Sequence, residues 1–435
     1  MNEKNNKKTI FGWSFYDWAK SAYETTTLGA ILPVYFVSVV VPDEGFLFRG
    51  KLYTGSEVWG FAIGSALFIF FLIMPTIGAI ADMSGNRMKF FKLFAYGGAI
   101  FASTFYFAQS GDVVLTLVIY FLAQFGATGS NVFYDSLLKD ITTEDTIDAV
   151  SARGYALGYL GGGLQLLLSL VIIQLGPSLL GVDTAVASRI AISFAGLWWL
   201  VFSIFSFSKI QYIESKSSTT NKNYLKSAYS TNLNTLKKIR KFPFLMYFLI
   251  AYLFYWDGLQ TVINMSAAFF TEVLLLDQTQ IIIVFLIVQF TAYFGAKLAG
   301  VMATKIGQKN TLYYTMFLIF LVGNAAYFIP EKQFFPVIIL GVLTAMGMGG
   351  LQSVSRSVYA AMLPKGSEGE FMGFFSVISR FAAIWGPLIY SYVSSTTGNP
   401  RLSLPVITSF FIIGFLLLRK VDMDKRISEE EWATS

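Results

Sequence analysis

The stretch SKIQYIESKSSTTNKNYLKSAYSTNLNTLKKIRK, residues 208–241, divides the sequence into two apolar halves. Glu214 is its single acidic residue, against Lys209, Lys216, Lys222, Lys226, Lys237, Lys238, Arg240 and Lys241. Lys and Arg collect in the cytoplasmic loops of membrane proteins. The stretch therefore predicts a cytoplasmic linker between two membrane-embedded halves.

The composition of the chain supports a membrane protein. Apolar residues make up 55% of the 435 residues and charged residues 13%, whereas a soluble domain carries roughly 25% charged residues. The chain contains no Cys and no His, which excludes disulfides, thiolate chemistry and most transition-metal sites. We therefore expect no cofactor, and any proton coupling has to use Asp or Glu.

Segments long enough to cross a bilayer recur along the whole chain. A hydrocarbon core of about 30 Å requires roughly 20 helical residues. The sequence predicts twelve transmembrane helices, at 12–41, 58–81, 90–109, 113–138, 152–175, 188–207, 242–274, 279–304, 310–329, 334–363, 371–395 and 402–418. The fold class is therefore all-α integral membrane, with an N-terminal bundle at 1–207, the basic linker at 208–241, and a C-terminal bundle with its tail at 242–435.

The remaining loops alternate in charge in step with the linker. Placing the linker in the cytoplasm also places Arg87, Lys89, Lys92, Lys139, Lys305, Lys309 and Lys365 there, together with both termini. The opposite loops keep few basic residues, which are Arg49, Lys51, Lys332 and Arg401. The basic pI is therefore interpreted as an effect of topology, and we expect no nucleic-acid partner.

The first predicted helix contains charged residues that a secretory leader would lack. Asp17, Lys20 and Glu24 interrupt the apolar stretch after the basic N-terminus, so we expect a retained first helix. With no targeting segment expected, a prokaryotic inner membrane is the predicted location.

The two halves resemble each other, which predicts pseudo-symmetric six-helix bundles. Gly78, Asp82, Gly85 and Arg87 in the first half match Gly300, Thr304, Gly307 and Lys309 in the second at one constant offset. Duplicated membrane halves are typical of secondary transporters, in which the substrate binds near the midplane between repeats.

Four stretches of the sequence carry a resemblance to a known family. They are YDWAKSAY at 16–23, SARGYALGYLGG at 151–162, YWDG at 255–258, and GGLQ at 349–352 followed by SRS at 355–357. Together with the loop 78–89, they resemble the major facilitator superfamily, and within it the vacuolar-effluxer-like branch related to an autophagy-linked amino-acid effluxer. The resemblance implies a transporter of twelve helices. The chain departs from the family pattern at Lys20, Asp135-Ser136 and Glu24.

Polar side chains form stripes on the first, fourth, seventh and tenth helices, which line the central cavity in the superfamily. We predict that the solute cavity is lined by Glu24, Asn131, Asp257, Gln260, Asn264, Gln352 and Arg356. Arg356 offers a planar fork of donors for a carboxylate. Glu24 or Asp257 would meet a cationic group or carry a coupling proton, because ionisable residues inside membranes usually face a cavity or a partner.

A second interpretation assigns several charges to gating. Salt bridges at the cytoplasmic side are favoured for Asp17, Asp135 and Arg153, and Arg356 is open to either role. Asp82, Arg87 and Lys89 surround the turn at Gly85 and predict a conformational latch. Lys20 is expected to neutralise Asp17 and Glu24, which share its helix face at spacings i, i+3 and i+7.

Small residues recur every four positions on two helices. Gly154, Gly158 and Gly162 on the fifth helix, and Gly295 with Ala299 and Ala303 on the eighth, allow close helix approach in lipid. The resemblance implies contact across the halves, and packing within one half is the alternative.

These observations predict a secondary transporter and no enzyme. The triplet Gly161–Gly163 follows no strand and lacks the Lys of a phosphate loop. The expected solute is small and polar or zwitterionic, with an amino acid or short peptide first, and coupling to protons is a further hypothesis. An amphipathic solute such as a lysolipid, sugar or drug is one alternative, and a non-transporting membrane sensor is another. We expect a monomer in the lipid bilayer.

Overall fold

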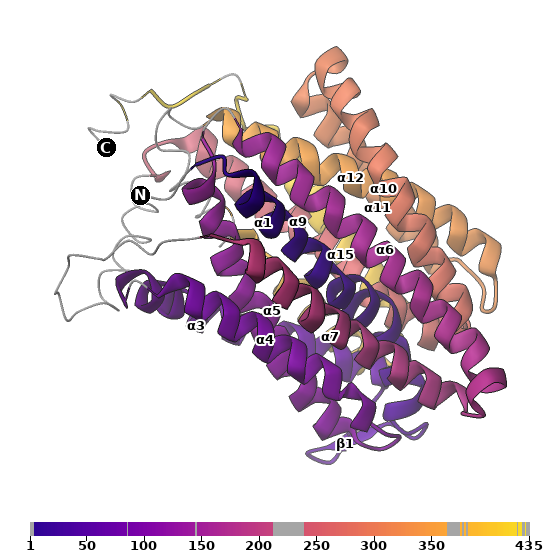
Figure 1. Cartoon of the computed structure of the whole chain (residues 1–435). Coiled ribbons are helices and arrows are strands. Elements are labelled where there is room, and N and C mark those ends of the chain that lie inside the picture. Colours follow the sequence, from indigo (N-terminus) through magenta and orange to yellow (C-terminus); the bar gives the residue numbers. More distant parts are fainter. Residues whose placement is uncertain are drawn as a thin grey trace. The chain divides into compact units, whose positions relative to one another are not determined.

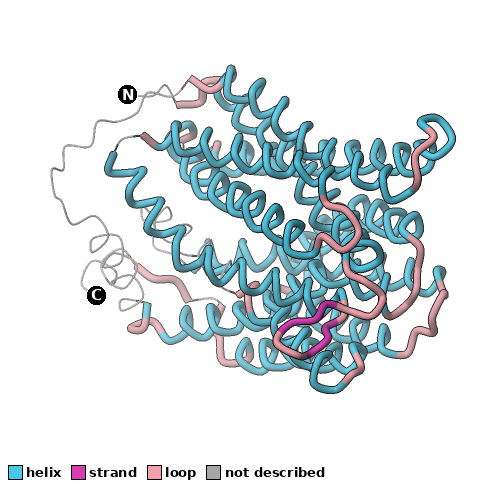
Figure 2. Tube along the Cα trace, turned by 90° about the horizontal axis from the view of Figure 1, so that it is seen from below, coloured by secondary structure: helices cyan, strands magenta, loops and turns pink. Residues whose placement is uncertain are grey.

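The computed structural model describes residues 4–84, 86–143, 146–211, 239–362, 375, 378–379, 382–423, 425–428 and 431. Long helices dominate this part of the chain (Figure 1). A short hairpin of two antiparallel strands, β1 (Phe46–Phe48) and β2 (Lys51–Tyr53), holds the only strands among the described residues (magenta in Figure 2). The all-α prediction is confirmed.

The first half of the chain forms one helical segment for each of its six predicted spans. In chain order the elements are α1 (Lys7–Ala22), η1 (Tyr23–Ile31), α2 (Leu32–Tyr35), η2 (Phe36–Val40), α3 (Gly55–Ser84), α4 (Arg87–Ser103), η3 (Thr104–Phe107), α5 (Val113–Ile141), α6 (Ile147–Leu180) and α7 (Thr184–Lys209). The first span is continuous, but η1 and η2 have π-helical hydrogen bonding.

The second half continues the same pattern. Its elements are α9 (Pro243–Glu272), α10 (Gln278–Ile306), α11 (Gln308–Tyr327), α12 (Phe334–Met362), α14 (Trp385–Thr397), η4 (Pro400–Leu402) and α15 (Ser403–Leu418). The linker prediction falls mostly on residues 212–238, which lie outside the described residues. Of the predicted eleventh span, residues 371–374, 376–377 and 380–381, all before α14, also lie outside them.

Described helical segments therefore overlap each of the twelve predicted spans, the eleventh only in part. Within the described residues, nine helices are long and apolar enough to cross a membrane. The segments α9, α11 and α14 are not among the nine. The described part of the eleventh segment, α14, has only 13 residues, which is too short to cross a membrane. In α9 and α11, several Tyr, Asn and Gln residues lower the mean hydropathy of the helix.

Large apolar side chains cover the outside of the helices. Leu93, Phe290 and Phe294 are each about two-thirds exposed, and many further Leu, Val, Ile and Phe side chains on the helices are also exposed. A soluble monomer rarely exposes apolar surface on this scale. Helices suit a lipid environment because they satisfy their own backbone hydrogen bonds.

Contacts between Cα atoms group the chain into two compact units. The first comprises Met1–Gly55 and Leu72–Ala228, and the second Ser56–Phe71 and Tyr229–Ser435. In the first unit α1 packs on α6 and α7, and α4 packs on α5 and α7. In the second, α10 packs on α12, and α9 and α11 pack on α15. The first part of α3 groups with the second unit, which the predicted bundle boundaries did not include.

Arg401 explains one exception to the charge pattern of the loops. One of its guanidinium nitrogens donates to the carbonyls of Tyr327 and Ile329, at 2.8 and 2.6 Å. The other lies 3.5 Å from the carbonyl of Val273. These carbonyls lie at or just after the ends of α11 and α9, where helical carbonyls lack partners within the helix. The cation therefore stabilises two helix ends of the second unit.

Candidate functional site

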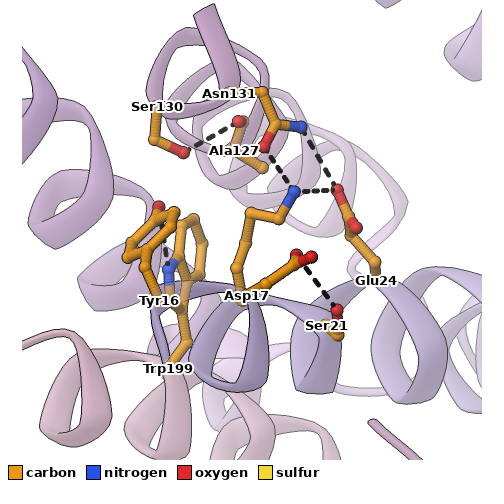
Figure 3. A network of polar contacts seen from close by, with 9 residues as sticks. Tyr16, Asp17, Ser21, Glu24, Ala127, Ser130, Asn131 and Trp199 are labelled. Carbon is orange, nitrogen blue, oxygen red and sulfur yellow. Dashed lines mark hydrogen bonds and ion pairs between the residues drawn. The ribbon is translucent and has the colours of Figure 1, made fainter. Parts of the chain in front are cut away.

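A polar cluster joins α1 and η1 to α5 within the first unit (Figure 3). Lys20 Nζ lies 3.0 Å from Glu24 Oε1 and donates to Asn131 Oδ1. The amide nitrogen of Asn131 is 3.4 Å from the same Glu24 oxygen. We call Asp17, Lys20, Glu24 and Asn131 the α1–α5 cluster.

The side chains of the α1–α5 cluster differ in their exposure. Asp17 and Lys20 are 8% and 5% exposed as residues, whereas the Glu24 side chain keeps 41% of its surface accessible. Glu24 also lies near the middle of the candidate span Lys7–Val40. An unpaired charge at the bilayer centre costs at least about 2.5–3.5 kcal/mol. The ion pair offsets this cost for Lys20 and Glu24.

Asp17 has a weaker set of contacts than its neighbours in the cluster. Its hydrogen bond from Ser21 Oγ is 3.5 Å long, which is at the limit for such a bond. Gly158 of α6 faces this carboxylate. A Cβ at that position would lie 2.7 Å from Ser21 Oγ and 3.1 Å from Asp17 Cγ. The absence of a side chain at Gly158 therefore makes room for the carboxylate.

Aromatic residues pack beside the α1–α5 cluster and fix its helix. Trp199 Nε1 of α7 donates to the buried hydroxyl of Tyr16 at 3.3 Å (Figure 3). Trp13 stacks on Tyr134 of α5, with ring centroids 4.2 Å apart, and donates to the carbonyl of the same residue. These contacts hold α1 against α5 and α7, so the charged side chains keep a defined position.

The second unit holds another buried carboxylate, on α9. Asp257 is 4% exposed, and its Oδ1 accepts a hydrogen bond of 2.9 Å from the backbone N–H of Gly386. Gly386 lies in the first turn of α14. A Cβ there would lie 1.6 Å from Thr261 Oγ1, so α9 and α14 are in close contact. The carboxyl oxygen thus lies at the N-terminal end of a helix, where backbone N–H groups lack partners within the helix.

The other predicted cavity residues are more accessible than Asp257. Gln260 and Asn264 on α9, and Gln352 and Arg356 on α12, are all partly exposed. Nearby, the buried hydroxyls of Tyr255 and Ser355 lie 2.8 Å apart and join the same two helices. Their roles in solute binding stay predictions.

The predicted latch contains an ion pair that the sequence did not reveal. Arg87 Nη1 lies 3.1 Å from Asp140 Oδ2, near the end of α5. Lys89 is exposed, and the side chain of Asp82 lies outside the described residues. The sequence held one signal for this pair. Asp140 is an acidic residue directly after Lys139, and Lys139 was predicted on the same side of the membrane as the basic loop that contains Arg87 and Lys89.

The remaining predicted gating residues lie in exposed positions. Asp135 on α5 is exposed. The guanidinium of Arg153 on α6 is also exposed, and lies over the ring of Phe11, 5.8 Å from its centroid. Their participation in salt bridges during transport stays a prediction.

A second polar contact region, at the start of α3, was also missed. Glu57 is 4% exposed and accepts a 3.0 Å hydrogen bond from Ser394 Oγ of α14. The backbone N–H of Ser56 donates to Glu272 at the end of α9, at 2.7 Å. All four residues belong to the second unit. No feature of the sequence singled out Glu57, because the predicted span began one residue later.

The predicted packing glycines contact helices of their own unit. Gly154 and Gly162 on α6 face Trp13 and Thr25, in α1 and η1. Gly295 on α10 faces the backbone of Met346 on α12, where a Cβ would lie 2.6 Å from the Cα atom. These contacts correspond to the alternative of packing within one half.

Among the described residues, no group of three or more Asp, Glu, His or Cys side chains is arranged to hold a metal ion. The chemistry that the described contacts offer is therefore that of charged groups, amides and hydroxyls.

Comparison with known proteins assigns the chain to a family. Residues 5–431 match the model of the family described as "Vacuole effluxer Atg22 like". An uncharacterized MFS-type transporter, YxiO, from Bacillus subtilis is 30% identical over 93% of both chains. Autophagy-related protein 22 from the yeast Vanderwaltozyma polyspora is 20% identical over 97% of this chain and 92% of its own.

Solved structures of transporters share the fold. A bacterial homologue of the human lysosomal transporter Spinster, inward-facing and unoccupied, has a TM-score of 0.69 at 14% identity. It is matched over its full length and covers 98% of this chain. A D-xylose–proton symporter has the same TM-score at 12% identity, over 97% of this chain and 99% of its own. These relatives are transporters and not enzymes. The chain is an integral membrane transporter of the major facilitator type, and it belongs to the family of Atg22-like vacuole effluxers.

Proposed function

We propose that the protein moves a small polar or zwitterionic solute across the membrane by alternating access, with amino acids as the first candidates. The observation that carries this proposal is the α1–α5 cluster, in which Glu24 is accessible near the middle of a membrane span. A charged group in that position suits a solute with a charged group of its own. Arg356, partly exposed on α12, offers a guanidinium that suits a carboxylate.

The names of the relatives support a transported small molecule and leave its identity open. We propose proton coupling through Glu24 or Asp257, because both are carboxylates within predicted spans and a structural relative is named as a proton symporter. One proton crossing at 100 mV supplies about 2.3 kcal/mol, which is enough to drive a useful gradient.

The proposed location is a prokaryotic inner membrane, with both termini and the linker at 208–241 in the cytoplasm. The bacterial relative supports the prokaryotic inner membrane. The excess of basic residues in the linker supports its cytoplasmic location. We propose that the transporter acts as a monomer made of two six-helix bundles.

Ligand-dependent stabilisation of the purified protein tests the proposed solute class. A ligand that binds only the folded state raises the apparent Tm. The detergent-purified chain would be screened against amino acids, dipeptides, sugars and lysolipids. We expect amino acids to raise the Tm, and we expect Glu24→Gln and Arg356→Ala to abolish that rise while Glu44→Gln, an exposed loop carboxylate, retains it. Stabilisation by lysolipids or sugars alone would replace the amino acid with the alternative solute.

A further inference from the structure

The α1–α5 cluster contains one more acidic group than basic groups. Asp17 and Glu24 are both within electrostatic reach of Lys20, the one ammonium group of the cluster. Lys20 has its described contacts with Glu24 and Asn131. Asp17 is more than nine-tenths buried, and its hydrogen bond among the described contacts is the long one from Ser21. With all three groups ionised, the cluster therefore has room for one additional positive charge.

Among the described residues, the titratable groups found to interact with the α1–α5 cluster are not basic. The titratable groups coupled to it are Tyr16 and Tyr23 on its own segment, Asp135 on α5 and Tyr159 on α6. Tyrosines are neutral near pH 7, and an aspartate side chain brings no positive charge. Packed against Asp17, α6 contributes Gly158, which has no side chain.

Lys20 itself shows which kind of group the α1–α5 cluster accepts. Its Nζ atom is an alkylammonium held between a carboxylate oxygen of Glu24 and the amide oxygen of Asn131. Asp17 lies one helical turn away on the same face, so the lysine side chain can turn to it. Among the charged members of the cluster, Glu24 is accessible, whereas Asp17 and Lys20 are buried.

We propose that the α1–α5 cluster binds the ammonium group of the solute in exchange for one proton. In the proton-loaded state one of the two carboxyl groups of the cluster carries a proton, and the cluster is neutral. When the solute enters, that proton leaves to water, the solute ammonium binds Glu24 and Asn131, and Lys20 turns to Asp17. The cluster is again neutral, so proton and solute compete for one position. This inference rests on the proposed transport function and names the amine as the recognised group.

Two analogues of leucine separate the amine from the carboxylate. Isoamylamine keeps the ammonium group, and isocaproate keeps the carboxylate. Each would be added to the detergent-purified full chain in weak buffer with a pH-indicator dye. We expect isoamylamine to release about one proton per molecule bound, and its apparent affinity to weaken up to about tenfold per unit of falling pH where the cluster already carries its proton. Isocaproate is expected to release none.

Variants test the assignment to individual residues. Glu24→Gln should abolish both amine binding and proton release, while Glu44→Gln retains them. Lys20→Met removes the competing internal ammonium and should tighten isoamylamine binding several-fold. Weaker binding in folded Lys20→Met would contradict the exchange, as would amine binding by the wild type without proton release, or no amine binding at all.

Uptake by proteoliposomes separates this inference from the proposed function. If the wild-type protein transports amino acids but fails the isoamylamine test, the transporter stands and the exchange at the α1–α5 cluster is wrong. If isoamylamine exchanges with protons but no solute is transported, the proposed function fails.

Discussion

Asp257 illustrates how one buried side chain can serve structure, transport or both. Its carboxylate accepts from the first turn of α14, and an Asn side chain can accept the same bond. We predict that Asp257→Asn keeps the stability of the protein, whereas Asp257→Ala lowers the free energy of unfolding by about 1–3 kcal/mol because the N–H of Gly386 loses its partner. Thermal unfolding in detergent measures the stability of both variants against the wild type. Equal losses in the two variants would show that the charge, and not the hydrogen bond, stabilises α14.

Arg401 gives a second prediction at the same scale. Its guanidinium contacts carbonyls at or just after the ends of both α9 and α11, and a lysine cannot reach several carbonyls with a planar fork. We predict that Arg401→Ala lowers the free energy of unfolding by about 1.5–3 kcal/mol, and that Arg401→Lys recovers only part of it. Arg49→Ala, at the exposed hairpin turn, is the control. A full rescue by lysine would reduce the role of Arg401 to its charge.

We predict that the ion pair Arg87–Asp140 of the predicted latch contributes little to the free energy of unfolding. Both side chains are about one-third exposed, and exposed ion pairs contribute about 0.2–1 kcal/mol. A double-mutant cycle with Arg87→Ala and Asp140→Ala, followed by thermal unfolding, is therefore expected to give a coupling energy in that range. A coupling well above it would mean that the pair is a permanent structural contact rather than a latch.

Contacts between single residues were predictable where both residues lie on one helix, because helical spacing alone decides whether they share a face. The spacing of Lys20 and Glu24 predicted their shared face and the neutralising role of Lys20, and the structure contains their ion pair. The contacts Asp257–Gly386 and Glu57–Ser394 join residues far apart in sequence. Such pairs depend on how helices pack, which the periodicity of one helix does not specify.

At the scale of helices, α4 and α5 are in contact through two glycines. A Cβ at Gly126 would lie 2.3 Å from the Cα of Gly98, so no side chain fits without moving a helix. We predict that Gly126→Ala lowers the free energy of unfolding by about 1–3 kcal/mol. The matched control is Gly97→Ala, because nothing lies within 4 Å of that position. If both variants unfolded at the wild-type temperature, the close contact of α4 and α5 would be contradicted.

Helix positions were predictable from hydropathy, but helix geometry was not. Long apolar segments predicted helices at every position where the structure has one. The π-helical hydrogen bonding of η1 begins at Tyr23, within the α1–α5 cluster. π-helical turns often mark functional sites, yet no residue pattern distinguishes them from α-helix in this sequence. The sequence therefore located the first span and left its internal geometry open.

At the scale of the whole molecule, the fold followed from composition, hydropathy and the family resemblance. The early part of α3 groups with the second unit, and no loop charge or repeat predicted this, because the grouping depends on tertiary contacts of Ser56 and Glu57. The solute was not predictable for a related reason. It depends on the arrangement of a few polar side chains and not on the pattern that makes the fold.

Uptake of radiolabelled amino acids into proteoliposomes tests the central claim most directly. The purified wild-type chain, Glu24→Gln and the control Glu44→Gln would be reconstituted side by side, with and without an imposed pH gradient. We predict that the wild type and Glu44→Gln accumulate at least one amino acid in a manner that depends on the gradient, and that Glu24→Gln does not. Uptake by Glu24→Gln equal to wild type, with the same dependence on the gradient, would contradict the role of the α1–α5 cluster in transport.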